Sequence, residues 1–324
     1  MGLSVLLIAL GLVLLVAGGE ALLRGAVGIA RLARLTPAVI GLTVVAAGTS
    51  VPELAVSVIA ASRGSPDITV GNVVGSNVFN LLVILGLTAL LRPLRITGNT
   101  VRLEYPVLVL VTLLCVVLCV DGTISRLDAI LFLAIYVCFT AYLLRLVRQQ
   151  MNEAERREFR EEVRELTTVN EQPPLFWLSL TMLVAGVCLL TGGAHAIVIG
   201  AVQLARLLGM TERVIGLTIV AVGTGLPELV TSLVSIYRGR DDVAIGNVIG
   251  SNLFNILGIL GLSALASPLP VAWAIGTSDN WWMLGATLLL WPIMVAHKRI
   301  NRWEGCVLLI VYGAYMTFLM WTGS

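Results

Sequence analysis

The feature that most constrains this sequence is a duplication. Residues 41–53 return as residues 216–228, an offset of 175 positions, with glycine, threonine, proline and glutamate in the same order. A second block follows each copy at the same distance, residues 71–80 in the first half and 246–255 in the second. The chain is therefore expected to fold as two copies of one unit.

The composition is that of an integral membrane protein. Hydrophobic residues make up 58% of the chain and charged residues 12%, with a mean hydropathy of +0.96. Soluble proteins carry about twice that share of charge. Basic residues flank the apolar runs and form no single face, which excludes a nucleic-acid-binding surface. The five cysteines lie inside apolar runs and are expected to be buried free thiols.

Apolar runs of spanning length, about 20 residues each, predict an all-α membrane protein of ten transmembrane helices. The first half, residues 1–148, and the second half, residues 175–324, each hold five helices, and a charged linker at 149–174 joins them. The predicted helices are 3–32, 37–61, 68–91, 101–120, 125–147, 175–208, 214–237, 243–266, 281–296 and 302–321. An odd number of helices per half gives the two repeats opposite orientations, as in inverted-repeat transporters. The second and seventh helices are interrupted at 48–52 and 223–227.

The basic residues predict the orientation, because cytoplasmic loops carry an excess of arginine and lysine. One side has only Arg63, Arg126, Arg206 and Arg213. The other side collects Arg31, Arg34, Arg92, Arg95, Arg102, six arginines from Arg145 to Arg164, Arg238, Arg240, Lys298, Arg299 and Arg302. The richer side is assigned to the cytoplasm. We therefore expect a multi-pass protein of the plasma (inner) membrane, with both termini outside and the linker inside.

Glu53 and Glu228 fall near the middle of apolar helices, where an ionisable residue usually marks an ion or substrate path. A paired or protonated carboxyl is the structural alternative, but no basic residue lies within a turn of either glutamate. The glycine and proline beside each glutamate interrupt the helix. The carbonyls expected to be freed are those of Ala46, Ala47, Ala221 and Val222. Free carbonyls at membrane depth persist only where they line a cavity or bind something.

Further oxygen ligands surround the two glutamates. The hydroxyl and amide candidates are Thr49, Ser50, Ser76, Asn80, Thr224, Ser251 and Asn255. This set contains oxygen only, which suits hard cations such as Ca²⁺ and Na⁺ and not zinc or copper. Two glutamates balance one Ca²⁺, two Na⁺ or two protons. Competition for one carboxylate pair is a direct route to exchange.

Two more groups of residues repeat in both halves. Gly71, Gly75, Gly246 and Gly250 form small-xxx-small patterns, predicted to bring helix 68–91 against 37–61 and helix 243–266 against 214–237. Asn72, Asn77, Asn247 and Asn252 either cross-link the backbone or bind ions. The residues alone leave both roles open.

The motif Gly-Thr-Ser-x-Pro-Glu, followed 27 residues later by asparagine, resembles the calcium/cation antiporter family, which includes the sodium/calcium exchangers. The resemblance covers nearly the whole chain and is closest to compact bacterial members without a large regulatory domain. It implies ten helices, alternating access and a central ion cluster. Carried over residue by residue, the resemblance implies that Glu53, Asn80, Glu228 and Asn255 form a central diamond of ligands. It implies flanking cation sites at Thr49, Ser50, Ser76, Thr224 and Ser251.

This sequence departs from the family pattern in two places. Gly225 stands where the first repeat has Ser50, so one hydroxyl ligand is missing. Asn80 and Asn255 are both asparagine, whereas sodium-dependent exchangers often carry an aspartate at one of these places. The driving ion, Na⁺ or H⁺, is therefore open.

The expected function is a secondary active antiporter that exchanges Ca²⁺ for Na⁺ or H⁺. A proton-coupled exchanger and a passive cation channel are the alternatives. An intramembrane enzyme is not favoured, because His195 and His297 form no catalytic or metal motif.

The expected partners are the transported cations and the bilayer, with no nucleic acid, no cofactor, and a monomer as the working state. Glu20 is expected to pair with Arg24 or to serve ion access, and His195 to pack or to relay protons.

Overall fold

The computed structural model describes residues 2–33, 37–96, 100–150, 176–208, 221–273 and 275–322, and these are almost entirely helical. The elements of the first half are α1 (Gly2–Ala33), α2 (Pro37–Ile40), η1 (Gly41–Val45), α3 (Ala46–Thr49), α4 (Val51–Ser62), α5 (Pro66–Phe79), η2 (Asn80–Ile84), α6 (Leu85–Leu91), β1 (Leu94–Arg95), η3 (Thr100–Glu104), α7 (Tyr105–Leu118), β2 (Thr123–Ile124) and α8 (Arg126–Gln150). Those of the second half are α10 (Phe176–Leu207), α12 (Ala221–Thr224), α13 (Leu226–Tyr237), α14 (Asp241–Leu253), η5 (Phe254–Leu260), α15 (Gly261–Ala266), β3 (Leu269–Pro270), η6 (Ile275–Asp279), α16 (Asn280–His297), β4 (Arg299–Ile300) and α17 (Arg302–Thr322). The η segments are stretches of π-helix.

The described part contains seven helices long and apolar enough to cross a membrane. An eighth span is the bent pair 41–49 and 51–62, which turns by 55° at Ser50. Two shorter apolar helices, α13 and α16, complete the set. The predicted helix at 214–237 lies partly outside the described residues. The linker predicted at 149–174 also lies outside them, apart from its first two residues, which end α8.

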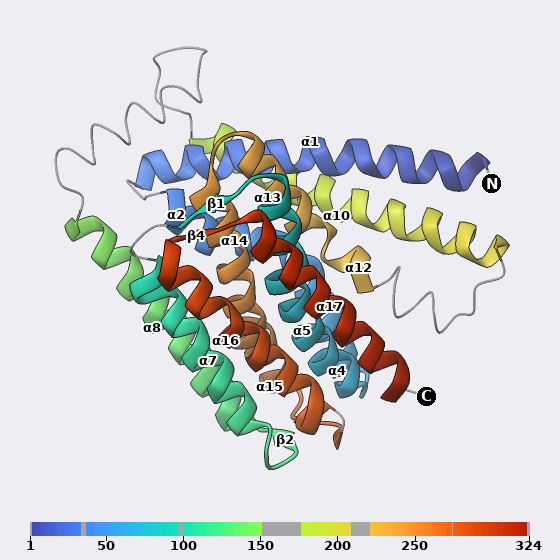
Figure 1. The fold of residues 1–324 in the computed structure, drawn as a ribbon, viewed down its shortest axis with the longest axis vertical. Helices are drawn as coiled ribbons and strands as arrows, with labels where there is room; N and C mark the ends of the chain where they lie inside the picture. Colours follow the sequence, from blue (N-terminus) through green and yellow to red (C-terminus); the bar gives the residue numbers. More distant parts are fainter. Residues whose placement is uncertain are drawn as a thin grey trace.

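Two continuous helices form the centre of the protein. In the most apolar 18-residue stretch of each of the spans 66–91 (α5, η2, α6) and 241–266 (α14, η5, α15), 83% of the residues are buried, far more than in the other long spans. Figure 1 shows α1 and α10 lying side by side and running across the direction of the remaining helices. The central pair is therefore enclosed by protein, whereas the outer helices offer apolar faces to lipid.

Close backbone contact joins the two halves at this centre. A β-carbon on Gly250 of α14 would overlap the carbonyl oxygen of Leu42 in η1, and one on Gly41 would lie 2.5 Å from the carbonyl oxygen of Val243. The prediction that Gly250 brings helix 243–266 against its own neighbour 214–237 is therefore wrong in its partner. Because Gly250 has no side chain, the broken helix of the first half, at Leu42, packs directly against α14.

Two short antiparallel sheets also join the halves. Leu94 of β1 pairs with Ile300 of β4, and Ile124 of β2 pairs with Leu269 of β3. A shift of 175 positions turns Leu94 into Leu269, so each sheet is the counterpart of the other with the halves exchanged. The apolar periodicity did not predict these strands, because each is only two residues long.

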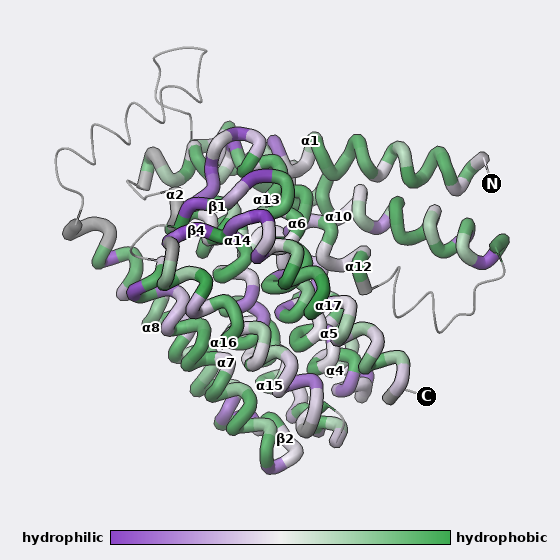
Figure 2. Tube along the Cα trace, in the orientation of Figure 1, coloured by the Kyte–Doolittle hydropathy of each residue, from purple (hydrophilic) through white to green (hydrophobic). Residues whose placement is uncertain are grey.

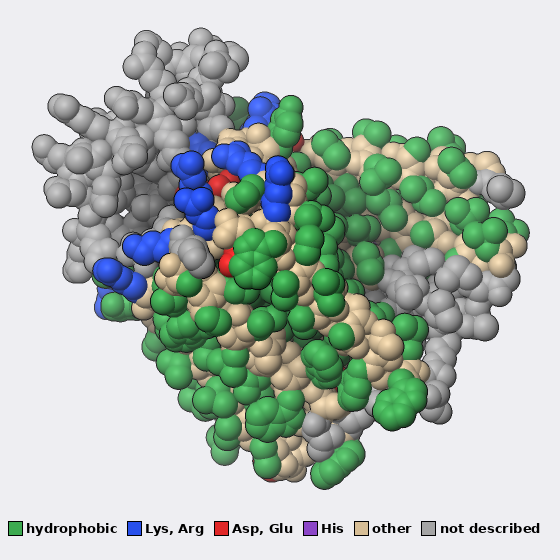
Figure 3. Space-filling model, viewed as in Figure 1, with side chains coloured by type: hydrophobic (Ala, Val, Ile, Leu, Met, Phe, Trp, Pro, Cys, Tyr) green, Lys and Arg blue, Asp and Glu red, His purple; other side chains and the backbone are tan. Residues whose placement is uncertain are grey.

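Polar residues gather at one end of the bundle. Hydrophilic residues cluster around β1 and β4 (Figure 2), and Lys and Arg side chains are concentrated at the same end (Figure 3). The pairing of β1 with β4 places Arg95 opposite Arg299, both from the side predicted to be basic.

The prediction that all five cysteines are buried free thiols is partly wrong. All five thiols are free, but only Cys115 and Cys119 are buried, since Cys138, Cys188 and Cys306 face outward from exposed helix faces.

Candidate cation site

The break in the first half lies at Ser50, between α3 and α4. The Ser50 N–H still reaches the Ala46 carbonyl at 3.1 Å, and the Thr49 hydroxyl donates to the same oxygen at 3.2 Å. The prediction that the Ala46 carbonyl is free is therefore wrong. Pro52 has no N–H, so the carbonyl deprived of its helical donor is the one four residues earlier, that of Gly48.

The second half breaks at the matching place, Gly225, between α12 and α13. The Gly225 N–H bonds to the Val222 carbonyl at 3.2 Å, so this carbonyl is not free either. Pro227 again lacks an N–H, and the carbonyl deprived of its donor is that of Gly223. Ala221 begins α12, at the edge of the described part of this helix.

Each break places a glutamate in the first turn of the helix that follows it. Glu53 lies in the first turn of α4 and Glu228 in the first turn of α13, and each is only 2% exposed. The N-terminal end of a helix stabilises negative charge. Ser50 donates from Oγ to Oε1 of Glu228 at 2.9 Å. The two breaks, 175 positions apart in sequence, therefore meet in space.

Asparagine side chains brace both glutamate helices from the central helices. Asn72 of α5 donates to the Ser57 hydroxyl at 3.0 Å and to the Glu53 carbonyl at 3.5 Å. Asn247 of α14 repeats this with Ser232 at 3.1 Å and the Glu228 carbonyl at 3.4 Å. These hydrogen bonds confirm the cross-linking role predicted for Asn72 and Asn247.

A second set of amides joins the two central helices. Asn80 donates to the Asn252 side-chain oxygen at 3.1 Å, and Asn255 donates to that of Asn77 at 3.0 Å. Asn77 also donates to the Asn252 backbone carbonyl at 3.4 Å. Asn80 begins the π-helical segment η2, and Asn255 lies in η5. Segments of this kind are frequent at functional sites.

Several buried oxygens at this centre have no hydrogen-bond partner within the described residues. They are Glu53 Oε2, Glu228 Oε2, Ser251 Oγ and Asn255 Oδ1. A buried oxygen without a partner is costly, about 1–3 kcal/mol each. A cation bound among them would satisfy carboxylate, hydroxyl and amide oxygens together, and that donor set fits Ca²⁺ or Na⁺.

The remaining predicted ligands lie around this centre. Thr49 is buried, and its hydroxyl also lies 3.3 Å from Oδ1 of Asn247. Ser76 lies on α5, one turn before Asn80, and is partly buried; its backbone carbonyl accepts from the Asn80 N–H, and its hydroxyl has no hydrogen bond to another described residue. Thr224 ends α12, is partly buried, and has a polar contact. The described part holds no group of three or more His, Cys, Asp or Glu side chains suited to a metal ion.

Sequence reasoning missed the residue that accompanies Gly225. The ring of Phe79 lies against this glycine, and a β-carbon there would come within 2.6 Å of the ring. The ring also makes an edge contact with Tyr312, with 5.9 Å between centroids. Gly225 therefore leaves room for an aromatic side chain of the other half. A phenylalanine directly before Asn80 and before Asn255 was the available signal.

The model of the family described as "Sodium/calcium exchanger protein" matches residues 3–145 and 178–321. Among curated proteins, the putative antiporter CaxA of Alkalimonas amylolytica is 39% identical over 98% of both chains. The sodium/calcium exchanger MaX1 of Methanosarcina acetivorans is 33% identical over 98% of both chains. The inner membrane protein YrbG of Escherichia coli is 36% identical over 82% of this chain and 81% of its own.

Solved structures of the sodium-calcium exchanger NCX_Mj share the fold. The structure soaked with zero Na⁺ and Ca²⁺ superimposes with a TM-score of 0.81 at 30% identity, covering 98% of this chain and 99% of that one. The structure soaked with 2.5 mM Na⁺ and 10 mM Sr²⁺ gives a TM-score of 0.79 at 31% identity, covering 97% and 98%.

Proposed function

The chain belongs to the sodium/calcium exchanger family, and we propose that it exchanges Ca²⁺ for Na⁺ or H⁺ at the pair Glu53 and Glu228. The observation that carries the proposal is the meeting of the two helix breaks through Ser50, with one oxygen of each carboxylate buried and without a hydrogen-bond partner among the described residues. Two carboxylates neutralise one Ca²⁺, and the same pair neutralises two monovalent ions. Divalent and monovalent cargo therefore compete for one site.

The proposed ligands come from both halves. Glu53, Glu228, Asn80 and Asn255 form the centre, and the side-chain oxygens of Thr49, Ser50, Ser76, Thr224 and Ser251 surround it. The Ala46 and Ala221 carbonyls are proposed at the breaks, although the Ala46 oxygen must first give up its two present hydrogen bonds. The amides of Asn72 and Asn247 brace the site and are not proposed as ligands.

The proposed architecture is ten membrane-spanning helices in two inverted repeats, residues 1–148 and 175–324, joined by a cytoplasmic linker. The correspondence between the two sheets and between the two helix breaks supports this arrangement. Inverted repeats supply two related conformations, each open to one side of the membrane. Exchange by alternating access follows, with the carboxylate pair facing one side at a time.

The driving ion is the open part of the proposal. The relatives named sodium/calcium exchangers favour Na⁺, and the missing hydroxyl at Gly225 favours H⁺, which needs fewer fixed ligands. A passive channel is the remaining alternative, and only an antiporter moves Ca²⁺ against its own gradient.

The test uses purified protein in sealed vesicles preloaded with Ca²⁺. An outward Na⁺ gradient and an outward H⁺ gradient are imposed in separate experiments, and Ca²⁺ uptake is followed against the Ca²⁺ gradient. Uphill uptake driven by one gradient identifies the coupling ion. Downhill flux alone, unaffected by either gradient, would contradict the antiporter and leave a channel.

A further inference from the structure

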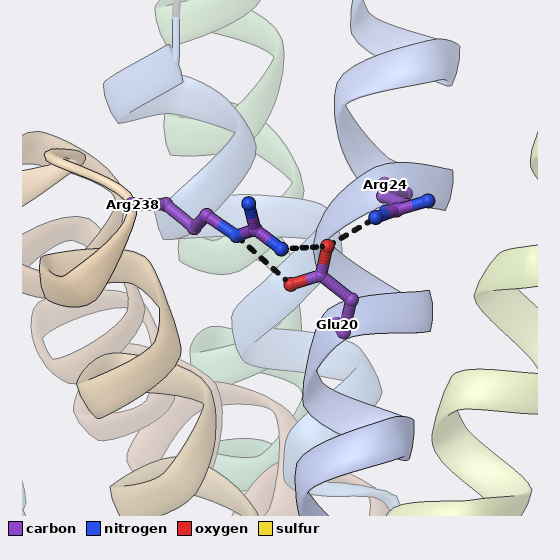
Figure 4. Close-up of polar contacts among 3 residues, drawn as sticks. All are labelled: Glu20, Arg24 and Arg238. Carbon is purple, nitrogen blue, oxygen red and sulfur yellow. Dashed lines mark hydrogen bonds and ion pairs between the residues drawn. The ribbon is translucent and has the colours of Figure 1, made fainter. Parts of the chain in front are cut away.

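An ion pair joins the outer helix α1 to the end of a site helix. Glu20 of α1 contacts Arg238, the residue that ends α13 (Figure 4). The Arg238 Nη2 atom lies 2.7 Å from Oε1 and its Nε atom 3.1 Å from Oε2. Arg24 adds a contact from Nε to Oε1 at 2.7 Å, which confirms the predicted pairing of Glu20 with Arg24. A two-point contact of this kind fixes direction as well as distance.

The helix that receives this contact also carries a proposed ligand. Arg238 lies at the C-terminal end of α13, where positive charge suits the helix dipole. Glu228 lies in the first turn of the same helix, ten residues earlier, or about 15 Å along the axis. The contact with Glu20 and the proposed ligand Glu228 are therefore at opposite ends of one short helix.

The helix that supplies the contact forms a unit with α10. Glycines recur every seven residues along the facing surfaces of both helices: Gly11, Gly18 and Gly25 on α1, and Gly186, Gly193 and Gly200 on α10. A β-carbon on Gly18 would lie 2.8 Å from the Leu190 backbone nitrogen, and one on Gly11 would lie 2.6 Å from the Gly193 carbonyl oxygen. The backbones are therefore in direct antiparallel contact.

The α1–α10 unit, defined by these two helices, touches α13 through a smooth apolar surface. Gly19 of α1 faces the side chains of Val230 and Val234. A β-carbon on Gly19 would lie 3.6 Å from the Val230 side chain and 3.4 Å from that of Val234. Small and branched apolar groups hold two helices together but set their register along the axis only weakly. The ion pair of Glu20 with Arg238 lies one residue away.

Among the described residues, the symmetry-related positions carry no equivalent of this ion pair. A shift of 175 positions turns Glu20 into His195 of α10 and Arg238 into Arg63, which follows α4. Both side chains are exposed, and neither takes part in an ion pair between described residues. Histidine and arginine carry no negative charge, so they cannot reproduce the contact. In the described part of the chain, the contact between α1 and α13 therefore has no counterpart between α10 and α4.

We propose that Glu20 is a positioning residue: through Arg238 it fixes the register of the α1–α10 unit on α13 and stabilises the arrangement described here over the one that opens to the other side. The inference rests on the proposed antiport function, since alternating access requires the site to exist in two such arrangements. Because the symmetry-related positions, His195 and Arg63, carry no such ion pair, its loss changes the cation affinities at the two faces unequally. The expected change in their ratio is about two- to five-fold, as for a partly exposed ion pair.

The experiment is a double-mutant cycle of Glu20→Gln, Arg238→Gln and the two combined, with Arg63→Gln as the matched control from the other half. Two measurements are made on full-length protein. Hydrogen exchange in detergent, without any gradient, reports on α1 around residue 20 and on the last turn of α13. Ca²⁺ flux in vesicles of known orientation gives the apparent Ca²⁺ affinity at each face.

Both single substitutions are expected to accelerate hydrogen exchange in these two segments and to shift the affinity ratio in the same direction. The double substitution is expected to do no more than either single one, because all three remove the same contact. Additive effects, effects no larger than those of Arg63→Gln, or faster exchange with an unchanged affinity ratio would each overturn the proposal. Native protein without gradient-driven Ca²⁺ flux would instead refute the antiport function, and the hydrogen-exchange cycle would still decide whether the ion pair sets the register.

Discussion

Ser50 in one half of the chain donates a hydrogen bond to Glu228 in the other, with 2.9 Å between Oγ and Oε1. The equivalent contact in the opposite sense would run from residue 225 to Glu53, and residue 225 is glycine. The two glutamates occupy matching helices, yet only Glu228 has this hydroxyl partner. The centre of the site is therefore asymmetric, and substitutions in the two halves are expected to differ in effect.

Replacing Ser50 with alanine is expected to weaken Ca²⁺ binding. The substitution removes a hydroxyl that holds Glu228 in place and is itself a proposed ligand. A lost hydrogen bond to a charged group costs about 1.5–3 kcal/mol, or roughly ten- to a hundred-fold in affinity. Binding calorimetry on purified protein measures the change. Ser62→Ala, on the exposed end of the same helix, is the control, and equal affinities in the two variants would remove Ser50 from the site.

Glu53→Gln and Glu228→Gln are each expected to abolish Ca²⁺ exchange. Glutamine keeps the shape of the side chain but removes one of the two charges that balance Ca²⁺. Size-exclusion profiles and circular dichroism should stay unchanged, because neutralising a buried carboxyl does not destabilise the fold by itself. Ca²⁺ flux in vesicles is the measurement. Near-normal exchange by either folded variant would refute the paired-carboxylate mechanism.

Much of the local chemistry of this site could be predicted from the sequence. The duplication located both breaks, both glutamates and the oxygen-rich surroundings, because glycine, proline and buried carboxyls have local physical consequences. One local prediction named the wrong carbonyl. Proline at position 52 removes the hydrogen-bond donor for the Gly48 carbonyl, whereas the Ala46 carbonyl keeps its hydrogen bond from the Ser50 N–H.

Contacts between the halves could not be predicted in the same way. A repeat identifies which residues correspond, but it does not say which helix faces meet. The partners of Gly250, Ser50 and Gly225 all lie in the opposite half, at Leu42, Glu228 and Phe79. The change from α- to π-helix at Asn80 likewise has no signature in the sequence.

Asn247→Ala is expected to destabilise the protein more than Asn72→Ala. Both amides brace a glutamate helix, but Asn247 is fully buried and also contacts the Thr49 hydroxyl, whereas Asn72 is partly exposed. Removing a buried amide leaves its partners unsatisfied, at a cost of about 1–3 kcal/mol. Thermal unfolding in detergent compares the two variants directly. A larger loss for Asn72→Ala would contradict the assigned role of burial.

The proposed topology places both termini outside and the linker in the cytoplasm. The prediction is tested with single cysteines at Asn170→Cys and Ser324→Cys in a background without the five native cysteines, three of which are exposed and would react. A membrane-impermeant maleimide added to intact cells is expected to label the cysteine at 324 and not the one at 170. Labelling at 170 alone would reverse the orientation and with it the assignment of the arginine-rich end.

Gly225→Ser is the substitution that would restore the missing hydroxyl, and from the sequence alone it is expected to strengthen external Na⁺ dependence. The structure adds a steric condition, because the Phe79 ring occupies the space that the new side chain needs. Overpacking of this kind costs typically 1–3 kcal/mol. Gly225→Ser alone is therefore expected to lower the melting temperature, and a second substitution, Phe79→Leu, to recover part of the loss.

The Na⁺ dependence of Ca²⁺ flux is then compared between the double variant and Phe79→Leu alone, at several external Na⁺ concentrations. A steeper Na⁺ dependence in the double variant supports a Na⁺ site at the second break, whereas identical curves would mean that the missing hydroxyl has no part in Na⁺ binding.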